Sequence, residues 1–294
     1  MSIFTNDTLN KITSSTSGKI NSQIIEFTKE ILFTKLSNYI TDPKKLDMIK
    51  NKISNIKIEL LSNEDFKNIY YKCNGSGFLP GGFQYLGIIY FRNDLEFDTV
   101  EFHKLIHEML HSISFNPESG KAGLFQISKE EKHYYGRGLN EAFTEYLTSI
   151  LLEDCFSGYS KDFYYIIQLV MQLTNLDIKE LFRLYISKKE WLTDELINTF
   201  NTNNDELIKL IIEYDNRLNP SKSFDPNNVF SYLFNSIKFK INNNEKLDTN
   251  KLQELLKEYY NYYYDVDHDL DVPVKTGMAE ILDILGTYKH KISR

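Results

Sequence analysis

The feature that most constrains this chain is a pair of histidines around a glutamate in one predicted helix. The stretch at positions 98–115 reads D-T-V-E-F-H-K-L-I-H-E-M-L-H-S-I-S-F. Within it His107, Glu108 and His111 form the pattern H-E-x-x-H. In a helix this spacing puts two imidazoles one turn apart on the same face, with a carboxylate beside them. Such a face is typical of a zinc site that carries its own general base.

The stretch also contains the signals of a helix. Asp98 or Thr99 can cap its start, and Glu101 completes a capping box with Asp98. Its apolar face consists of Val100, Phe102, Leu105, Ile106, Met109, Leu110 and Ile113. The Asn-Pro pair at 116–117 predicts its end. The alternative is a solvated helical face with two unrelated histidines, but a chance match is rare in a chain with only 6 histidines.

A second amphipathic helix is predicted around Glu141, thirty residues after His111. Positions 136–153 read G-R-G-L-N-E-A-F-T-E-Y-L-T-S-I-L-L-E. Glu141 and Glu145 lie one turn apart on the flank opposite its apolar residues. Glu141 can complete a His, His, Glu ligand set that leaves the fourth position to water, as in catalytic zinc sites. Glu145 can accept a hydrogen bond from the distal nitrogen of a ligand histidine.

Together the two motifs resemble the gluzincin superfamily of zinc metallopeptidases, which includes the thermolysin-type proteases and a group of aminopeptidases. The resemblance rests on H-E-M-L-H at 107–111 and L-N-E-A-F-T-E-Y at 139–146. It implies that His107, His111 and Glu141 bind zinc and that Glu108 is the general base. The alternative third ligands are Glu118, Glu145 and Glu153.

The same resemblance implies supporting roles for two neighbours of Glu141. Glu145 falls where the thermolysin type has an aspartate that orients the first histidine, and Asn140 matches the asparagine before the ligand glutamate. The gap between the motifs is longer than is usual in the family, which predicts an extra loop or hairpin in 112–138. The aminopeptidase motif G-x-M-E-N is absent, and its nearest match at 80–84 lacks the acidic residue. Endopeptidase activity is therefore favoured over exopeptidase activity.

Three further polar side chains are candidates for the site. His133 and Tyr135, with Tyr134 between them, can donate a hydrogen bond to the oxyanion that forms when water attacks a carbonyl. Their alternative is an ordinary surface or packing role. His103, four residues before His107, is interpreted as a helix-surface histidine or as one that contacts the ligands without binding metal.

The expected fold is α+β and zincin-like, with two lobes. A small helix-plus-sheet lobe, 1–116, ends in the H-E-x-x-H helix, and a mainly helical lobe, 117–294, carries the third ligand. Apolar periodicity predicts helices at 20–40 and 43–53 and strands at 55–61 and 83–91, with a loop at 73–82. In the second lobe helices are expected at 163–173, 178–186, 190–200, 206–214, 228–241, 250–264 and 276–290.

Composition excludes other function classes. The net charge of -7 and the absence of a Lys/Arg cluster argue against binding to nucleic acid. The N-terminus lacks the features of a signal peptide, and no apolar run approaches membrane-spanning length. A cytoplasmic protein is expected, with a secreted mature form as the alternative. The two cysteines, Cys73 and Cys155, are too few for a disulfide framework.

A weaker metal signal lies near the C-terminus. Four aspartates alternate around His268 in the segment 265–271. The segment has Leu270 and Thr276 where a calcium-binding EF-hand has Gly and Glu. Either a solvated acidic loop or a weak calcium site fits this pattern.

The predicted function is hydrolysis of peptide bonds in a peptide or protein substrate, through a zinc-bound water and Glu108 as base. Two alternatives remain. One is a zincin-fold protein that binds or regulates a partner, with a structural zinc or none. The other is a zinc hydrolase that acts on a bond other than a peptide, because the chemistry is shared.

Overall fold

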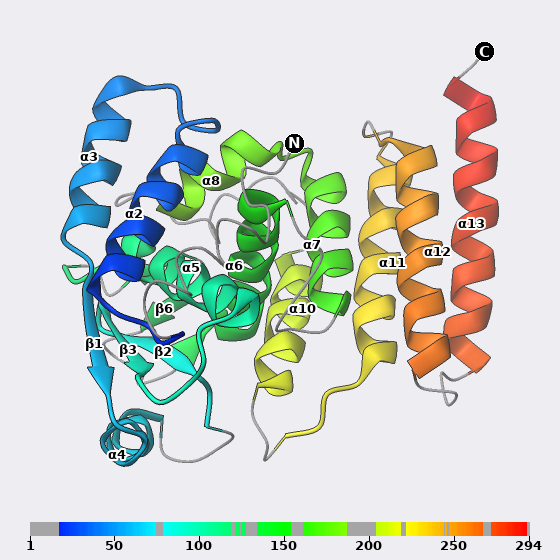
Figure 1. Cartoon of the computed structure of the whole chain (residues 1–294). Helices are drawn as coiled ribbons and strands as arrows, with labels where there is room; N and C mark the ends of the chain where they lie inside the picture. Colours follow the sequence, from blue (N-terminus) through cyan, green and yellow to red (C-terminus); the bar gives the residue numbers. More distant parts are fainter. Residues whose placement is uncertain are drawn as a thin grey trace. The chain divides into compact units, whose positions relative to one another are not determined.

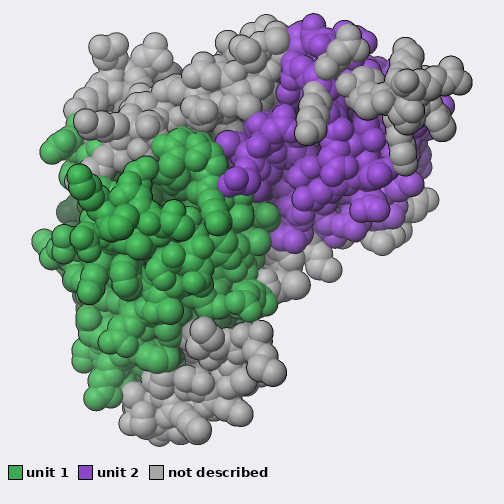
Figure 2. Space-filling view, turned by 90° about the horizontal axis from the view of Figure 1, so that it is seen from above, with its two compact units in different colours: residues 1–123, 144–159, 178–189 green, residues 124–143, 160–177, 190–294 purple. Residues whose placement is uncertain are grey.

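The computed structural model describes residues 18–74, 79–118, 121–123, 125–127, 134–153, 161–186, 204–218, 222–243, 245, 247–266 and 272–292. The described chain is an α+β protein in which helices predominate (Figure 1). It divides into two compact units (Figure 2). Unit 1 comprises 1–123, 144–159 and 178–189, and unit 2 comprises 124–143, 160–177 and 190–294. The predicted lobes, 1–116 and 117–294, divide the chain differently and stay a prediction.

The described part of unit 1 begins with two helices that match the predicted ones. Helix α2, Ser22–Leu36, starts at Asn21, whose side chain accepts hydrogen bonds from the backbone N–H groups of Gln23 and Ile24. Helix α3, Pro43–Ser54, starts in the same way at Asp42 and has proline at its first position, where no N–H is needed. Both caps belong to the residue types that favour helix starts.

A three-stranded sheet follows. Its strands are β1, Lys57–Leu61, β2, Gly82–Tyr85, and β3, Ile88–Arg92. β3 is central, parallel to β1 and antiparallel to β2. Helix α4, Asn63–Asn74, contacts β1 and β3 and is not among the predicted elements. Its Phe66 is fully buried, and the Phe66 and Phe83 ring centroids are 5.2 Å apart.

The single strand predicted at 83–91 is wrong, because β2 and β3 form a hairpin there. Leu86 and Gly87 make its two-residue turn, with φ angles of 50° and 85°. Positive φ at both positions is the geometry that matches the twist of paired strands. A leucine rarely adopts positive φ, so the sequence contains only half of the usual turn signal.

Helix α5, Thr99–Ser114, contacts β2 and β3 as well as α2, α3 and α8, Ile178–Ile186. It leads into the short strand β4, Phe115–Asn116, which pairs antiparallel with β5, Lys121–Ala122. Helix α6, Arg137–Leu152, is continuous but is divided between the units after residue 143. Of its residues, the part from Thr144 onward belongs to unit 1 together with α5 and α8.

Unit 2 is mainly helical. It contains the antiparallel pair β6, Phe125–Ile127, and β7, Tyr134–Tyr135, followed by the start of α6. Its further helices are α7, Lys161–Thr174, α10, Asn204–Arg217, α11, Pro226–Asn242, α12, Thr249–Val266, and α13, Val272–Ile292. Helix α13 packs against both α11 and α12, and the three stand side by side in Figure 1. The helix predicted at 190–200 lies outside the described residues.

Aromatic rings fill the interior of unit 2. Tyr214, Phe230 and Tyr259 are fully buried, from α10, α11 and α12. The Phe230 and Tyr259 ring centroids are 4.8 Å apart, and the hydroxyls of Tyr214 and Tyr259 are hydrogen-bonded at 3.2 Å. Buried tyrosines whose hydroxyls find partners in this way stabilise a helical core. Within the described ranges, none of the helices combines the length and the apolar character that crossing a bilayer requires.

Candidate metal centre

Helix α5 presents a row of three buried histidines. The Asp98 side chain caps its start and accepts hydrogen bonds from the N–H groups of Val100 and Glu101, each at 2.9 Å. His103, His107 and His111 follow at intervals of four residues, which places them on one face. Their exposed fractions are 1%, 3% and 6%. His103 is therefore not a helix-surface residue, one of its two predicted roles.

The start of helix α6 is set by a residue of α10. The two carboxylate oxygens of Asp215 accept hydrogen bonds from the N–H groups of Gly136, at 2.8 Å, and Gly138, at 2.7 Å. Gly136 has a φ of 86°, and a Cβ atom at Gly138 would lie 1.9 Å from the carbonyl oxygen of Tyr214. The two glycines thus allow α10 and the first turn of α6 to approach closely. Glu141 lies one turn further along α6.

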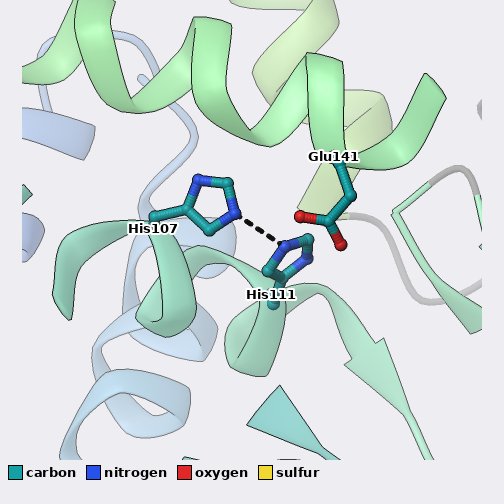
Figure 3. Close-up of side chains that lie close together, drawn as sticks. All are labelled: His107, His111 and Glu141. Atoms are coloured by element: carbon teal, nitrogen blue, oxygen red, sulfur yellow. Dashed lines mark hydrogen bonds between the residues drawn. The ribbon is translucent and has the colours of Figure 1, made fainter. Parts of the chain in front are cut away.

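Three of the predicted ligands come together. The ligand atoms of His107, His111 and Glu141 all lie within 4.8 Å of one another, and this group can hold a metal ion. Figure 3 shows both imidazoles and the carboxylate directed toward the same point. The Nε2 atoms of His107 and His111 are 3.0 Å apart. Two nitrogens bound to one tetrahedral zinc ion are about 3.3 Å apart, so the imidazoles are close to a ligand arrangement.

Glu145 links His107 to His103. Its Oε2 lies 3.1 Å from His107 Nδ1, and its Oε1 lies 3.0 Å from His103 Nε2. An ionised carboxylate can only accept hydrogen bonds, so His107 donates through Nδ1. Its Nε2 is then directed toward the other ligands. Burial acts to raise the pKa of the Glu145 carboxyl, but hydrogen bonds and charges from His103 and His107 lower it to about 2. Glu145 is thus ionised at neutral pH.

His111 is held by hydroxyl groups instead. Its Nδ1 lies 3.4 Å from Thr144 Oγ1 and 3.5 Å from the hydroxyl of Tyr185. The Thr144 and Tyr185 hydroxyls are hydrogen-bonded to each other, and both residues are fully buried. The sequence does not predict this contact, because Tyr185 lies on α8, 74 residues after His111. The only local signal is that Tyr185 falls on the buried face of an amphipathic helix.

The remaining predicted residues have different positions. Glu108 is half-buried on α5 beside His107, and Asn140 is buried directly before Glu141. Tyr135 belongs to β7, but its side chain is not among those described, and His133 and the aspartates at 267–271 lie outside the described residues. Of the alternative ligands, Glu153 is paired with Lys35 at 2.7 Å, Glu118 is exposed, and Glu145 contacts His107 at the nitrogen remote from the ligand group.

Comparisons of the chain with models of protein families, with curated proteins and with solved structures found no match. The interpretation of the site therefore rests on its own residues. What they establish is a group of two buried histidines and one half-buried glutamate that can hold a metal ion.

Proposed function

We propose that this chain is a zinc metallopeptidase, with His107, His111 and Glu141 as the zinc ligands and Glu108 as the general base. The observation that carries the proposal is the convergence of the three ligand side chains from two helices. The pairing of Glu145 with His107 supports it, because metal-binding histidines commonly donate their second N–H to a carboxylate.

The donor set favours zinc over the harder cations. Two imidazole nitrogens and one carboxylate oxygen are typical of zinc, whereas calcium and magnesium prefer oxygen ligands throughout. Three protein ligands leave one coordination position open, and an open position is typical of catalytic zinc sites rather than structural ones. The set thus supports an enzyme more than a protein in which zinc only stabilises the fold.

The residues of the chain would divide the chemistry as follows. A bound zinc ion supplies a Lewis acid that polarises the scissile carbonyl and lowers the pKa of water. Glu108 takes the proton of the attacking water and passes it to the leaving nitrogen. Its half-buried position fits this task, because a general base needs contact with both the site and the substrate. The substrate is a peptide or protein, and cleavage is internal to it.

The proposal includes a zincin-like fold for unit 1. A small sheet in the order β1-β3-β2 accompanies the helix that carries the H-E-x-x-H pattern, and that helix contacts β2 and β3. This arrangement supports the relationship to gluzincins that the motifs imply.

The test compares the unaltered chain with three variants, purified without chelators or affinity metals. Zinc per chain is measured together with cleavage of a fluorogenic peptide library. Glu108→Gln should keep its zinc and lose about a thousandfold in kcat/KM. Glu141→Ala should lose most of its zinc, while Glu118→Ala, which removes an exposed carboxylate, should keep it.

Three results would contradict the proposal. Near-native activity of Glu108→Gln would contradict the assignment of Glu108 as the general base. A chain that takes up no zinc would contradict the assignment of the metal site. If the chain binds zinc and cleaves esters or non-peptide amides but no peptide, the peptidase is replaced by the alternative, a zinc hydrolase that acts on another bond.

A further inference from the structure

His103 is a buried histidine outside the ligand group. It lies on α5 one turn before His107 and is 1% exposed. Its Nε2 atom is 3.0 Å from Glu145 Oε1, and Glu145 is equally buried. Placing an imidazole and a carboxylate in an apolar interior is costly unless they are hydrogen-bonded to suitable partners. If His103 only stabilised the fold, any buried acceptor could serve as its partner. Its partner is instead Glu145, the carboxylate that also contacts the proposed ligand His107.

The geometry of Glu145 depends on both of its histidines. A carboxylate held through one oxygen can still turn about its terminal side-chain bond, because that torsion has broad energy wells. Here Oε2 contacts His107 Nδ1 while Oε1 contacts His103 Nε2. Two contacts on two different oxygens define the plane of the carboxylate. The plane in turn determines where the hydrogen-bond acceptor for His107 lies.

We propose that His103 is a positioning residue for the metal site, which acts by holding Glu145 in the orientation that aligns His107. The inference rests on the proposed zinc site. The three histidines of α5 then have two tasks. His107 and His111 provide ligand atoms, and His103 aligns Glu145, the carboxylate that contacts His107. Metal ligands are held to productive geometry by such outer contacts, whose loss costs about 10–100-fold in metal affinity.

The competing explanation is that the His103 ring only fills volume between α5 and the adjacent part of α6. Three substitutions separate the two explanations. In His103→Gln the side-chain amide nitrogen falls near the position of Nε2 and can donate to Glu145. In His103→Asn the amide is one carbon shorter and does not reach. His103→Leu keeps apolar volume and has no donor.

The experiment measures zinc affinity of the full chain by competition with a chromophoric chelator, without any activity assay. We expect His103→Gln to bind zinc within a few-fold of the unaltered chain, and His103→Asn and His103→Leu to bind about 10–100-fold more weakly. Gln and Asn are similarly polar, so their comparison remains decisive if the Leu variant does not fold. Unchanged affinity in all three variants would overturn the proposal, and so would equal weakening in Gln and Asn.

A double-mutant cycle tests whether His103 acts through Glu145. Glu145→Ala should weaken zinc binding, and adding His103→Asn to it should weaken binding no further. Full additivity of the two losses would overturn the proposal. Failure of the zinc site itself is distinguishable, because then the unaltered chain would bind no zinc. If the unaltered chain binds zinc and the His103 variants bind it equally well, only the role of His103 is wrong.

Discussion

The two helices of the candidate metal centre begin in different ways. Helix α5 is capped by Asp98, the residue directly before it, which accepts two backbone hydrogen bonds through one oxygen. Helix α6 is capped by Asp215, which belongs to α10 and accepts hydrogen bonds through both oxygens. Both carboxylates satisfy N–H groups that a helix leaves without internal partners. One cap is local, and the other is 77 and 79 residues away in the sequence.

This difference predicts which changes the site tolerates. Helix α5 contains its own starting signal, so its histidines keep their spacing as long as the helix forms. The first turn of α6 depends on α10, so the position of Glu141 depends on the packing of a distant segment within unit 2.

The largest effect is expected for Gly138→Ala. The new methyl group would lie 1.9 Å from the Tyr214 carbonyl oxygen, a distance that forces α6 and α10 apart. The clash is with backbone atoms, which cannot move aside as the end of a flexible side chain can. We therefore expect a loss of about 3 kcal/mol in the free energy of unfolding. Urea unfolding measures this loss, and zinc content should fall with it.

Gly286→Ala is the matched control for that substitution. Gly286 also lies in a helix, α13, and a Cβ atom there would meet nothing within 4 Å. Alanine should therefore stabilise the chain by about 0.5–1 kcal/mol, because it lowers the entropy of the unfolded state. If both substitutions had the same sign and size, the close approach at Gly138 would not matter to the fold.

The next largest effect is expected for Asp215→Ala. It leaves the N–H groups of Gly136 and Gly138 without their acceptor in a partly buried place, which costs about 2 kcal/mol. Hydrogen exchange should rise at the first turn of α6 and remain unchanged in α5. Equal protection of α6 in both proteins would show that the distant cap is dispensable.

Asp215 also makes the stability of the fold depend on pH. Burial raises the pKa of the Asp215 carboxyl, against the lowering effect of the hydrogen bonds from Gly138 and Gly136. A raised pKa in the folded state means that the protonated form stabilises the fold below about pH 3.9, and that this contribution disappears as pH rises. The destabilisation caused by Asp215→Asn should therefore shrink as pH rises above about 3.9, the ordinary pKa of an aspartate.

The same contrast explains what the sequence predicts. The H-E-x-x-H pattern and the paired glutamates are recognisable in the sequence, because each depends on spacing within one helix, where residues i and i+4 share a face. The structure confirms the mixed α+β class with mainly helical content. This class is also predictable from residue spacing within single elements. The zincin-like relationship and the peptidase activity stay predictions.

What the sequence does not predict depends on long-range contacts. Asp215 is one of many acidic residues in or beside the predicted helices, and its neighbours in the sequence do not indicate a contact with α6. Tyr185 reads as an ordinary core residue, although its hydroxyl lies beside His111. The sequence does not predict the hairpin of β2 and β3, because Leu86 stands at a turn position where glycine or asparagine is usual.

A smaller effect is expected for Asp98→Ala. The cap is exposed and local, and N-cap substitutions of this kind typically cost about 1 kcal/mol. Asp98→Asn keeps an acceptor and should cost much less. Because α5 packs on several elements, we expect zinc affinity to stay nearly unchanged while the midpoint of urea unfolding falls. A loss that exceeds the one caused by Asp215→Ala would reverse the contrast between the two helices.

The smallest effect is expected for Tyr185→Phe, which tests the hydroxyl pair beside His111. The substitution keeps the ring that fills the core and removes a hydroxyl 3.5 Å from His111 Nδ1, while Thr144 stays at 3.4 Å. A neutral contact of that length contributes about 0.5 kcal/mol, or roughly a twofold change in zinc affinity. Removing the Glu145 carboxylate should cost far more, since charged hydrogen bonds are stronger. Chelator competition measures both variants. If Tyr185→Phe weakens zinc binding as much as Glu145→Ala does, the hydroxyl pair supports the site as strongly as the carboxylate, and the expected order is wrong.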